Sequence, residues 1–457
     1  MSLADRFPFG KAPFFLTAVA VVSTVFVLYT QGQKAAQKPD LTLAIFAPNH
    51  VESYQKAIDA FERKRGVKVS LQLVHNRALQ TRLQNAMLAG TEVPDLVEMG
   101  AGEISFFTRG PLEDVGFVDL TDRLEKEGLR SRLVESRLSI WSSRKRVFAL
   151  PHDVHPVALM YRADLVEELG IDVSKLTTWD AFVETGRKVL KDLDGDGVID
   201  RYMIDMPSSA FWGLGILLLQ QDIPLFDEQG KISFDQPKTV DTIVWYLRQT
   251  QSKDRIAFEC GWGQSLMKAV SDGLALFYFA PDWRTQTTMM DMPRLKGKLK
   301  IMPLPAWEPG GRRTSVWGGS GLAIPKSNPN VELAWEFAKV LYFDKQALGE
   351  RFKYTGLLPP LKDAWDLPEF NEPKPFYSGQ KLGQIYAELA REAPADWSTP
   401  YKTQAEGKVS EVFLRSVLYF KENGENGLRE FVSRELGVAR AALQKDMDRN
   451  VFQKEGR

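Results

Sequence analysis

The chain has 457 residues, and its 59 Lys and Arg side chains are balanced by 59 Asp and Glu side chains. This zero formal charge argues against a general nucleic-acid binder. A hydrophobic fraction of 44% with 26% charged residues is ordinary for a folded soluble chain, which excludes wholesale disorder and a polytopic membrane protein. The single cysteine, Cys260, excludes an intramolecular disulfide and a multi-cysteine metal site, and the length suits two or three domains.

The first element is an uncharged apolar run over residues 12–29, which is just long enough to cross a bilayer as a helix. Arg6 and Lys11 precede it, as in a signal peptide or a signal anchor. No cysteine lies near its end, which excludes lipoprotein-type acylation. We predict an anchor that holds a periplasmic or extracytoplasmic body at the cytoplasmic membrane, with residues 31–40 as a polar tether; a cleaved signal peptide is the alternative.

The body opens with alternating strand and helix patterns. Apolar runs and period-2 alternation predict strands over residues 41–47, 67–74 and 96–99, and apolar residues at helical spacing predict helices over 51–65 and 79–88. This βαβαβ order indicates an α/β fold with a mainly parallel sheet. Since ligands bind beyond the carboxyl ends of such strands, residues 48–50 and 100–103 are candidate binding loops.

The pattern continues along the chain with further elements of both kinds. A helix is predicted over residues 178–190, with Thr178 as its N-cap, because an apolar face follows the threonine. The remaining predictions are strands over 147–151, 274–279, 299–302 and 321–324, helices over 161–169, 211–219, 238–249 and 331–341, and a mostly helical C-terminal part with breaks at Gly424 and Gly427.

Seven stretches together resemble the family 1 extracellular solute-binding proteins of ABC importers, the maltose- and oligosaccharide-binding type. In chain order they are YQKAIDAFERKRGVKV (54–69), VPDLVEMG (93–100), FALPHDVHPVALMYRADLVEELGI (148–171), TTWDAF (177–182), DGLALFYFAPDW (272–283), GGSGLAIPKSN with LAWEFAKVL (318–341), and TGLLPP (355–360). Each stretch is weak alone, whereas seven in the family's order are specific.

The resemblance implies a two-lobe periplasmic-binding-protein fold of type II, with the ligand held between lobes that close over it. Both lobes are then discontinuous in sequence. Residues 1–39 would form the anchor and tether, residues 40–153 with 320–371 the first lobe, and residues 154–319 with 372–457 the second lobe.

A sugar site needs aromatic planes for stacking and polar side chains for the hydroxyl groups. By motif position, the resemblance implies ligand contacts at Asn49, His50, Glu103, Asp153, His155, Ser209, Trp212, Asp282, Trp283 and Trp317. Trp212 and Trp317 have packing in the core or near the hinge as their alternative role. In the maltose-binding pattern an aromatic residue stands at the position of Met99 and an acidic-Pro-Tyr sequence at that of Ser208–Ser209, so their replacement here argues against maltodextrin.

Two clusters raise the question of metal binding. His50, His152 and His155 could hold zinc, but the H-D-V-H spacing lies on a loop and no cysteine supports it. We therefore favour either hydrogen bonds to a ligand or local structural bonds for these histidines. Asp192, Asp194, Asp196 and Asp200 resemble the first nine positions of a calcium loop. Met203 stands where a bidentate glutamate is expected, so this loop is only a candidate calcium site and we predict no cofactor.

We predict a monomeric substrate-binding subunit of an ABC importer that binds a neutral sugar or oligosaccharide and delivers it to the permease subunits. A sugar-sensing subunit of a signalling system is one alternative. A carbohydrate-active enzyme using Glu103, Asp153 or Asp282 is another, although neither G-x-x-x-x-G-K-[ST] nor H-E-x-x-H occurs. An anionic ligand is a further alternative, because Arg284 lies next to Trp283 in the sequence.

Overall fold

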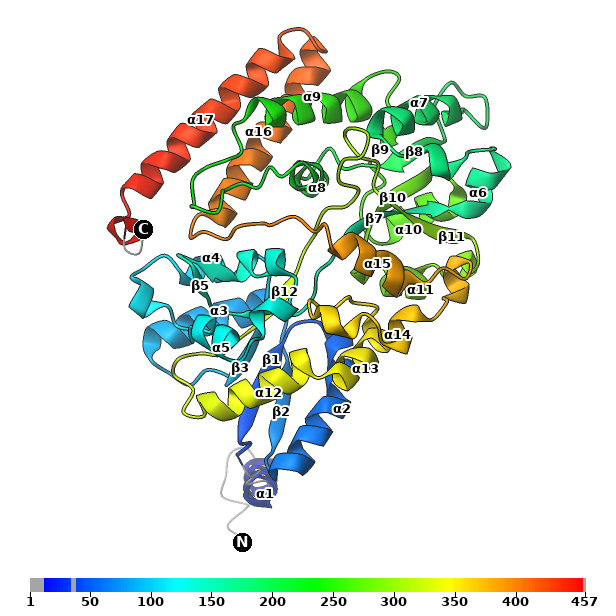
Figure 1. Ribbon diagram of the computed structural model, residues 1–457. Helices are drawn as coiled ribbons and strands as arrows, with labels where there is room; N and C mark the ends of the chain where they lie inside the picture. Colours follow the sequence, from blue (N-terminus) through cyan, green and yellow to red (C-terminus); the bar gives the residue numbers. More distant parts are fainter. Residues whose placement is uncertain (1–11, 34–37, 455–457) are drawn as a thin grey trace. The chain divides into compact units, whose positions relative to one another are not determined.

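The structure is a computed structural model that describes residues 12–33 and 38–454 (Figure 1). The chain divides into two compact units, Met1–Asp40 and Leu41–Arg457. The first unit contains helix α1 (Ala12–Gln33), whose described side chains, residues 15–25, are exposed. Among the described residues no helix is long and apolar enough to cross a membrane, so the anchor predicted over residues 12–29 is not supported. The predicted tether lies partly outside the described residues.

The first of two five-stranded sheets contains the opening of the body. Its strands lie in the order β2 (Val69–Leu73), β1 (Leu41–Ile45), β3 (Leu96–Gly100), β12 (Ser320–Ala323) and β6 (Leu150–Pro151). β1 pairs in parallel with β2 and β3, whereas β12 is antiparallel to β3 and β6. The predicted βαβαβ unit is therefore confirmed, and a strand from much later in the chain joins it.

Each face of this sheet is covered by helices. Leu41, Leu43 and Ile45 share a core with α2 (Pro48–Arg65), α12 (Val331–Phe343) and α13 (Lys345–Thr355). Ala44 and Val97 point to the opposite core, which contains α3 (Asn76–Ala89). Successive strand residues face opposite sides of a sheet, which explains why both cores draw on the same strands. We call the part built on this sheet the first lobe.

The second sheet has the strand order β11 (Leu299–Pro303), β7 (Val157–Arg162), β10 (Ala275–Pro281), β8 (Tyr202–Asp205) and β9 (Ala257–Phe258). β7 is antiparallel to β10 and β11, and β10, β8 and β9 are parallel to one another. We call the part built on this sheet the second lobe. In Figure 1 it is drawn above the first lobe, and crossing segments of the chain join the two.

Helices also cover the second sheet. α7 (Trp179–Val189) begins after Thr178, whose hydroxyl accepts a hydrogen bond from the Ala181 amide at 3.3 Å, so the predicted cap is confirmed. The helices that share its core are α8 (Trp212–Gln220), α9 (Pro237–Gln251), α16 (Lys402–Asn423) and α17 (Leu428–Asp448). The other helices are α4 (Ile104–Phe107), α5 (Thr121–Lys126), α6 (Ala163–Glu168), α10 (Gln264–Asp272), α11 (Trp283–Asp291), α14 (Pro368–Asn371) and α15 (Leu382–Ala390).

Two predicted elements need correction. The helix predicted over residues 161–169 begins later, because Tyr161 and Arg162 end strand β7 and α6 starts at Ala163. The strand predicted over residues 147–151 is two short strands, β5 (Arg146–Val147), which pairs with β4 (Ser142–Ser143), and β6. All six residues of β7 are buried, so the strand lacks the alternation that would have distinguished it from a helix.

Candidate functional site

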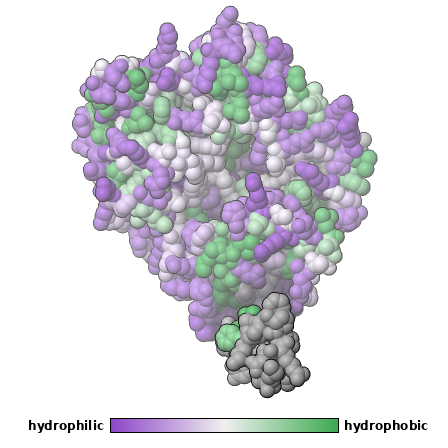
Figure 2. Space-filling model, turned by 180° about the vertical axis from the view of Figure 1, so that it is seen from behind, coloured by the Kyte–Doolittle hydropathy of each residue, from purple (hydrophilic) through white to green (hydrophobic). Residues whose placement is uncertain are grey.

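Two crossing segments run side by side where the lobes join. Pro156 pairs with Val316 in an isolated antiparallel bridge, and the Trp317 amide donates a hydrogen bond to the His155 carbonyl at 3.3 Å. These segments carry several of the predicted site residues to the ends of β6, β7 and β12. Seen from behind in Figure 2, the face is mostly hydrophilic at its periphery, and paler and more hydrophobic residues lie toward its middle.

We call the region where the crossing segments pair, around residues 153–156 and 316–317, the joint, and His155 lies at its centre. Its Nε2 atom lies 3.1 Å from Oδ2 of Asp153, and its Nδ1 atom lies 2.5 Å from Oδ1 of Asp282, at the end of β10. All three side chains are buried. Burial alone would lower the pKa of His155, but the two carboxylates outweigh this effect and raise it to about 9. The imidazole is therefore protonated at neutral pH and bridges the two lobes.

Both carboxylates also accept backbone hydrogen bonds. Asp153 accepts one from the Ser320 amide at 3.1 Å, and Asp282 accepts them from Leu358 at 2.7 Å and from Trp283 at 2.8 Å. The structure thus brings together Asp153, His155 and Asp282, three of the residues expected from the sequence to contact the ligand. Their polar atoms are engaged with one another and with the backbone.

Four tryptophans cluster beside this joint. Trp212 and Trp317 stack face to face with ring centroids 4.3 Å apart and planes 7° apart. Trp283 lies 5.2 Å from Trp317 between centroids, and its indole N–H donates to the Trp317 carbonyl at 3.2 Å. Trp262 lies 6.1 Å from Trp283 and is 58% exposed. The predicted site residues Trp212, Trp283 and Trp317 therefore contact one another, and Trp262 is the most solvent-exposed ring of the four.

Arg284 occupies the middle of this aromatic cluster. Its guanidinium carbon lies 4.5 Å from the ring centroid of Trp262 and 5.0 Å from that of Trp317, and Nη1 donates to the Phe279 carbonyl at 3.0 Å. Burial lowers the pKa of Arg284 to about 10, so the group is still a cation at neutral pH. A cavity of about 130 Å³ is lined by Trp262, Trp283 and Arg284, among others. The guanidinium is thus placed to make cation–π contacts with these rings.

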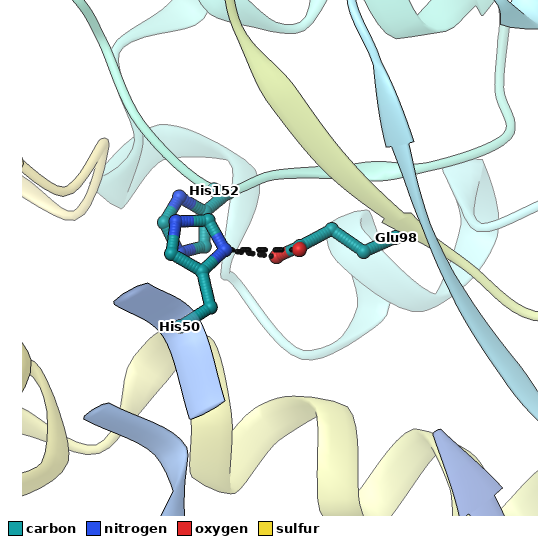
Figure 3. Close-up of side chains that lie close together, drawn as sticks. All are labelled: His50, Glu98 and His152. Atoms are coloured by element: carbon teal, nitrogen blue, oxygen red, sulfur yellow. Dashed lines mark hydrogen bonds and ion pairs between the residues drawn. The ribbon is translucent and has the colours of Figure 1, made fainter. Parts of the chain in front are cut away.

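His50 belongs to a separate buried cluster in the first lobe (Figure 3). Its Nδ1 atom lies 2.9 Å from both carboxylate oxygens of Glu98, and its ring stacks on that of His152 at 4.3 Å. Burial would raise the pKa of Glu98, but the contact with His50 leaves it lowered. Burial, with the positive charge of Arg351, lowers the pKa of His152 to about 3, so His152 is neutral.

The other predicted site residues lie apart from these clusters. Asn49 is exposed at the start of α2. Glu103 accepts a hydrogen bond from the Gly100 amide at 3.0 Å, and burial raises its pKa. The Ser209 hydroxyl pairs with Glu259, which also accepts from the Ser208 hydroxyl at 2.9 Å. No described contact joins Asn49, Glu103 or Ser209 to the tryptophans.

The aspartate loop uses its carboxylates to hold its own backbone. Asp192 accepts hydrogen bonds from the amides of Gly195 at 2.7 Å and Gly197 at 2.8 Å, and Asp200 accepts one from Leu193 at 2.8 Å. The carboxylates of Asp192, Asp194 and Asp200 also come close enough to share an ion, while Asp196 is outside that group. Asx-type bonds of this kind account for the loop without a metal, so the loop stays only a candidate calcium site.

Sequence reasoning missed Trp262, Glu98 and the role of Arg284 in orienting the rings. Trp262 stands between Gly261 and Gly263 and follows β9, so its signal was a lone aromatic residue in a glycine-flanked loop. Glu98 had a different signal, which was a carboxylate within a strand whose neighbours are all apolar.

The two sheets, the paired crossing segments and the aromatic cluster at their junction define the class of two-lobed α/β binding proteins. Residues 47–348 match the family described as bacterial extracellular solute-binding protein, and the chain belongs to this family.

Individual relatives are similar over most of the chain. The arabinooligosaccharide-binding protein of Bacillus subtilis (strain 168) is 26% identical over 404 residues, which cover 87% of this chain and 91% of the relative. The protein of the same name from Halalkalibacterium halodurans is 24% identical over 362 residues, covering 77% and 79%. The solved structure of the sugar-binding protein MalE from Xanthomonas citri has a TM-score of 0.72 and 18% identity, covers 90% of this chain and 99% of MalE, and supports the two-lobe fold.

Proposed function

We propose that this chain is the solute-binding subunit of an ABC importer, and that it binds a neutral sugar or oligosaccharide between its two lobes. It would work outside the cytoplasm as a monomer and deliver the sugar to permease subunits. The observation that carries this proposal is the cluster of four tryptophans beside the joint, because the apolar face of a sugar ring stacks on an indole. The names of the two arabinooligosaccharide-binding relatives support the same ligand class.

The lobe boundaries in this proposal are those expected from the sequence, 40–153 with 320–371 and 154–319 with 372–457. The strand pairing supports them, since β12 lies in the sheet of β1 and β3 although it follows β11 of the other sheet. A sugar held between the lobes would contact both, and its binding energy would then favour the closed arrangement.

Trp262 and Trp283 are the proposed stacking surfaces. Trp262 is the more open ring, whereas the facing sides of Trp212 and Trp317 are already covered by each other. Glu103 and Asn49 from the first lobe and the Ser209–Glu259 pair from the second are the proposed partners of the sugar hydroxyls. They are polar groups outside the buried network of the joint, so hydroxyls can reach them without breaking it.

Asp153, Asp282 and His155 have a different proposed role. Their polar atoms are paired with one another and with backbone amides, and their side chains are buried. A sugar hydroxyl that bonded to either carboxylate would have to displace one of these partners, which leaves a buried group unsatisfied. We therefore assign these three residues to holding the joint and positioning the tryptophans, in place of the direct ligand contact expected from the sequence.

Arg284 favours a neutral ligand. Arg284 is 5% exposed, and its guanidinium donates to the Phe279 carbonyl and lies among the aromatic rings. The guanidinium is already engaged with the rings and with a backbone carbonyl, which disfavours its pairing with a phosphate or carboxylate. The chain belongs to a family of solute-binding proteins, and carrying a solute requires no bond to be broken. We therefore expect a bound sugar to be released unchanged.

Thermal denaturation against a ligand panel tests the proposal. The panel should contain arabino-oligosaccharides of increasing length, other neutral oligosaccharides, monosaccharides, polyols and sugar phosphates. A ligand at 100 times its dissociation constant stabilises a binder by about 2.7 kcal/mol, which is readily measured. We expect a neutral oligosaccharide to raise the melting temperature and to be recovered intact. Stabilisation by sugar phosphates alone would contradict a neutral ligand, and recovery of a cleaved sugar would indicate an enzyme.

A further inference from the structure

A buried group of possible metal ligands lies in the first lobe, away from the tryptophans. His50 comes from the first turn of α2, Glu98 from β3, and His152 from the segment that crosses to the second lobe (Figure 3). Their exposed fractions are 3%, 0% and 0%. One ligand atom from each residue lies within 4.8 Å of those from the other two. Three elements that are distant in sequence therefore place two imidazoles and a carboxylate together.

His152 has an unsatisfied atom in this group. Its Nδ1 atom lies 2.9 Å from Oδ2 of Asp153, whereas its Nε2 atom is fully buried and has no hydrogen-bond partner among the described residues. Since Nδ1 donates a hydrogen bond to this carboxylate, Nε2 carries the lone pair of the neutral ring and receives no hydrogen bond. A buried acceptor without a donor is costly, on the order of 1–3 kcal/mol. Metal-binding histidines share this arrangement, in which a carboxylate holds one ring nitrogen and the other nitrogen binds the ion.

His50 and Glu98 are close to the geometry that an ion requires. The distance between His50 Nδ1 and either oxygen of Glu98 is 2.9 Å. Neighbouring ligand atoms around tetrahedral zinc lie roughly 3.3 Å apart, given metal–ligand distances of about 2.0–2.1 Å. Every separation between ligand atoms in the group is within 4.8 Å, so the atoms must approach by at most about 1.5 Å to reach this spacing. The Tyr54 hydroxyl donates to Glu98 at 2.8 Å and would orient the carboxylate.

We propose that His50, Glu98 and His152 form a buried zinc site that ties α2, β3 and the crossing segment together. Two imidazoles and one carboxylate suit zinc better than calcium or magnesium, which prefer sets made only of oxygen ligands. Glu98 and Asp153 supply negative charge against the ion. The site is independent of sugar binding, since none of its ligands belongs to the aromatic cluster. It also differs from the histidine set considered from the sequence, because Glu98 takes the place of His155.

Zinc binding by the untagged, full-length protein tests this site directly. The protein is treated with EDTA, dialysed, and titrated with zinc chloride in a calorimeter, with metal content measured afterwards by elemental analysis. We expect one tightly bound zinc per chain. Cobalt(II) in place of zinc should give the visible absorption bands of a tetrahedral site. A protein that binds no zinc after this treatment, or gives no such bands, would overturn the proposal and leave a metal-free histidine–glutamate pair.

Variants distinguish this site from surface binding. His152→Gln should lower zinc affinity more than about 100-fold, and Asp153→Asn should lower it by about 10–100-fold through loss of the supporting hydrogen bond. The matched control is His75→Gln, because His75 is the fourth histidine of the chain and is exposed. A second control, Asp192→Asn with Asp194→Asn, removes carboxylates of the aspartate loop. Both controls should bind zinc normally. If His152→Gln retains its far-UV circular dichroism and its zinc affinity, or if either control loses the ion, the assignment is wrong.

Discussion

The Nδ1 atom of His155 lies 2.5 Å from Oδ1 of Asp282, a residue 127 positions further along the chain. On the other side of the same ring, Nε2 lies 3.1 Å from Asp153. Asp153 accepts a hydrogen bond from the start of β12 in the first lobe, and Asp282 directly follows β10 in the second. One imidazolium thus connects the two lobes at the point where the chain passes between them.

Because of this bridge, we predict that the free energy of unfolding decreases in alkaline solution. The pKa of His155 is about 9 in the folded protein and about 6.5 in an unfolded chain, so folding favours the protonated ring. The stabilisation of the folded protein by the protonated His155 ring is complete below pH 6.5 and is lost as the pH rises through 9. A difference of this size corresponds to on the order of 3 kcal/mol. The charged groups that set it are Asp153 and Asp282, with the Arg137 guanidinium close enough to interact with both.

Urea unfolding at pH 6.5 and at pH 9.5 measures this effect, and His155→Asn is the control. Asparagine is chosen because the backbone of His155 has φ 55°, a left-handed conformation that asparagine tolerates. The wild type should lose more unfolding free energy between the two pH values than the variant. Equal losses in both proteins would show that His155 is not the titrating group.

Trp262→Ala should weaken sugar binding while leaving the fold nearly intact. Its ring is 58% exposed, so we expect a change of about 1 kcal/mol or less in unfolding free energy. Loss of one stacking surface should reduce affinity roughly tenfold or more. Tryptophan fluorescence titration with the best ligand of the panel provides the measurement. Trp262→Phe keeps an aromatic face and should retain most of the affinity; an alanine variant with wild-type affinity would exclude Trp262 from the site.

Arg284→Met should disorganise the aromatic cluster. The substitution keeps an unbranched apolar stem but removes the hydrogen bond to Phe279 and the cation beside the rings. We expect a loss of about 2 kcal/mol in unfolding free energy and a changed tryptophan emission spectrum. Arg284→Lys keeps the charge without the planar group, so its unfolding free energy and emission should lie between those of the wild type and of the methionine variant. Wild-type stability and emission in the methionine variant would show that the cation does not organise the rings.

Gly321→Ala tests the packing of β12 against Trp141 within the first lobe. A Cβ atom at this position would lie 2.6 Å from Cε2 of Trp141, which is fully buried. We expect a loss of about 1–3 kcal/mol in unfolding free energy from overpacking. Gly407 in α16 is the matched control, because a Cβ atom there meets nothing within 4 Å and alanine favours a helix. The prediction fails if both variants are as stable as the wild type.

The local patterns of the sequence were sufficient for most elements of the fold. The alternation of strand and helix from Leu41 to Gly100 depends on periodicities within short windows, and the structure confirms it. β7 was missed because it is buried on both faces, which removes the period-2 pattern. The short pairing of β4 with β5 depends on a turn and not on any apolar run.

The candidate site was less predictable because its contacts join distant residues. Motif position placed Trp212, Trp283 and Trp317 among the expected ligand contacts, but it could not show that Trp262 lies beside them. It also could not show that the carboxylates of Asp153 and Asp282 meet on one histidine. Tertiary packing decides which residues pair in this way. Asp153 and Asp282 have side chains suited to sugar hydroxyls, but in the structure they contact His155 where the lobes join.

A crystal structure of the protein with the sugar that binds most tightly in the panel would test the central claim most directly. We predict an intact sugar between the lobes, with one ring stacked on Trp262 or Trp283 and hydroxyl groups bonded to side chains of both lobes. A sugar bound by one lobe alone, away from the tryptophans, or a sugar cleaved in the crystal would contradict the account.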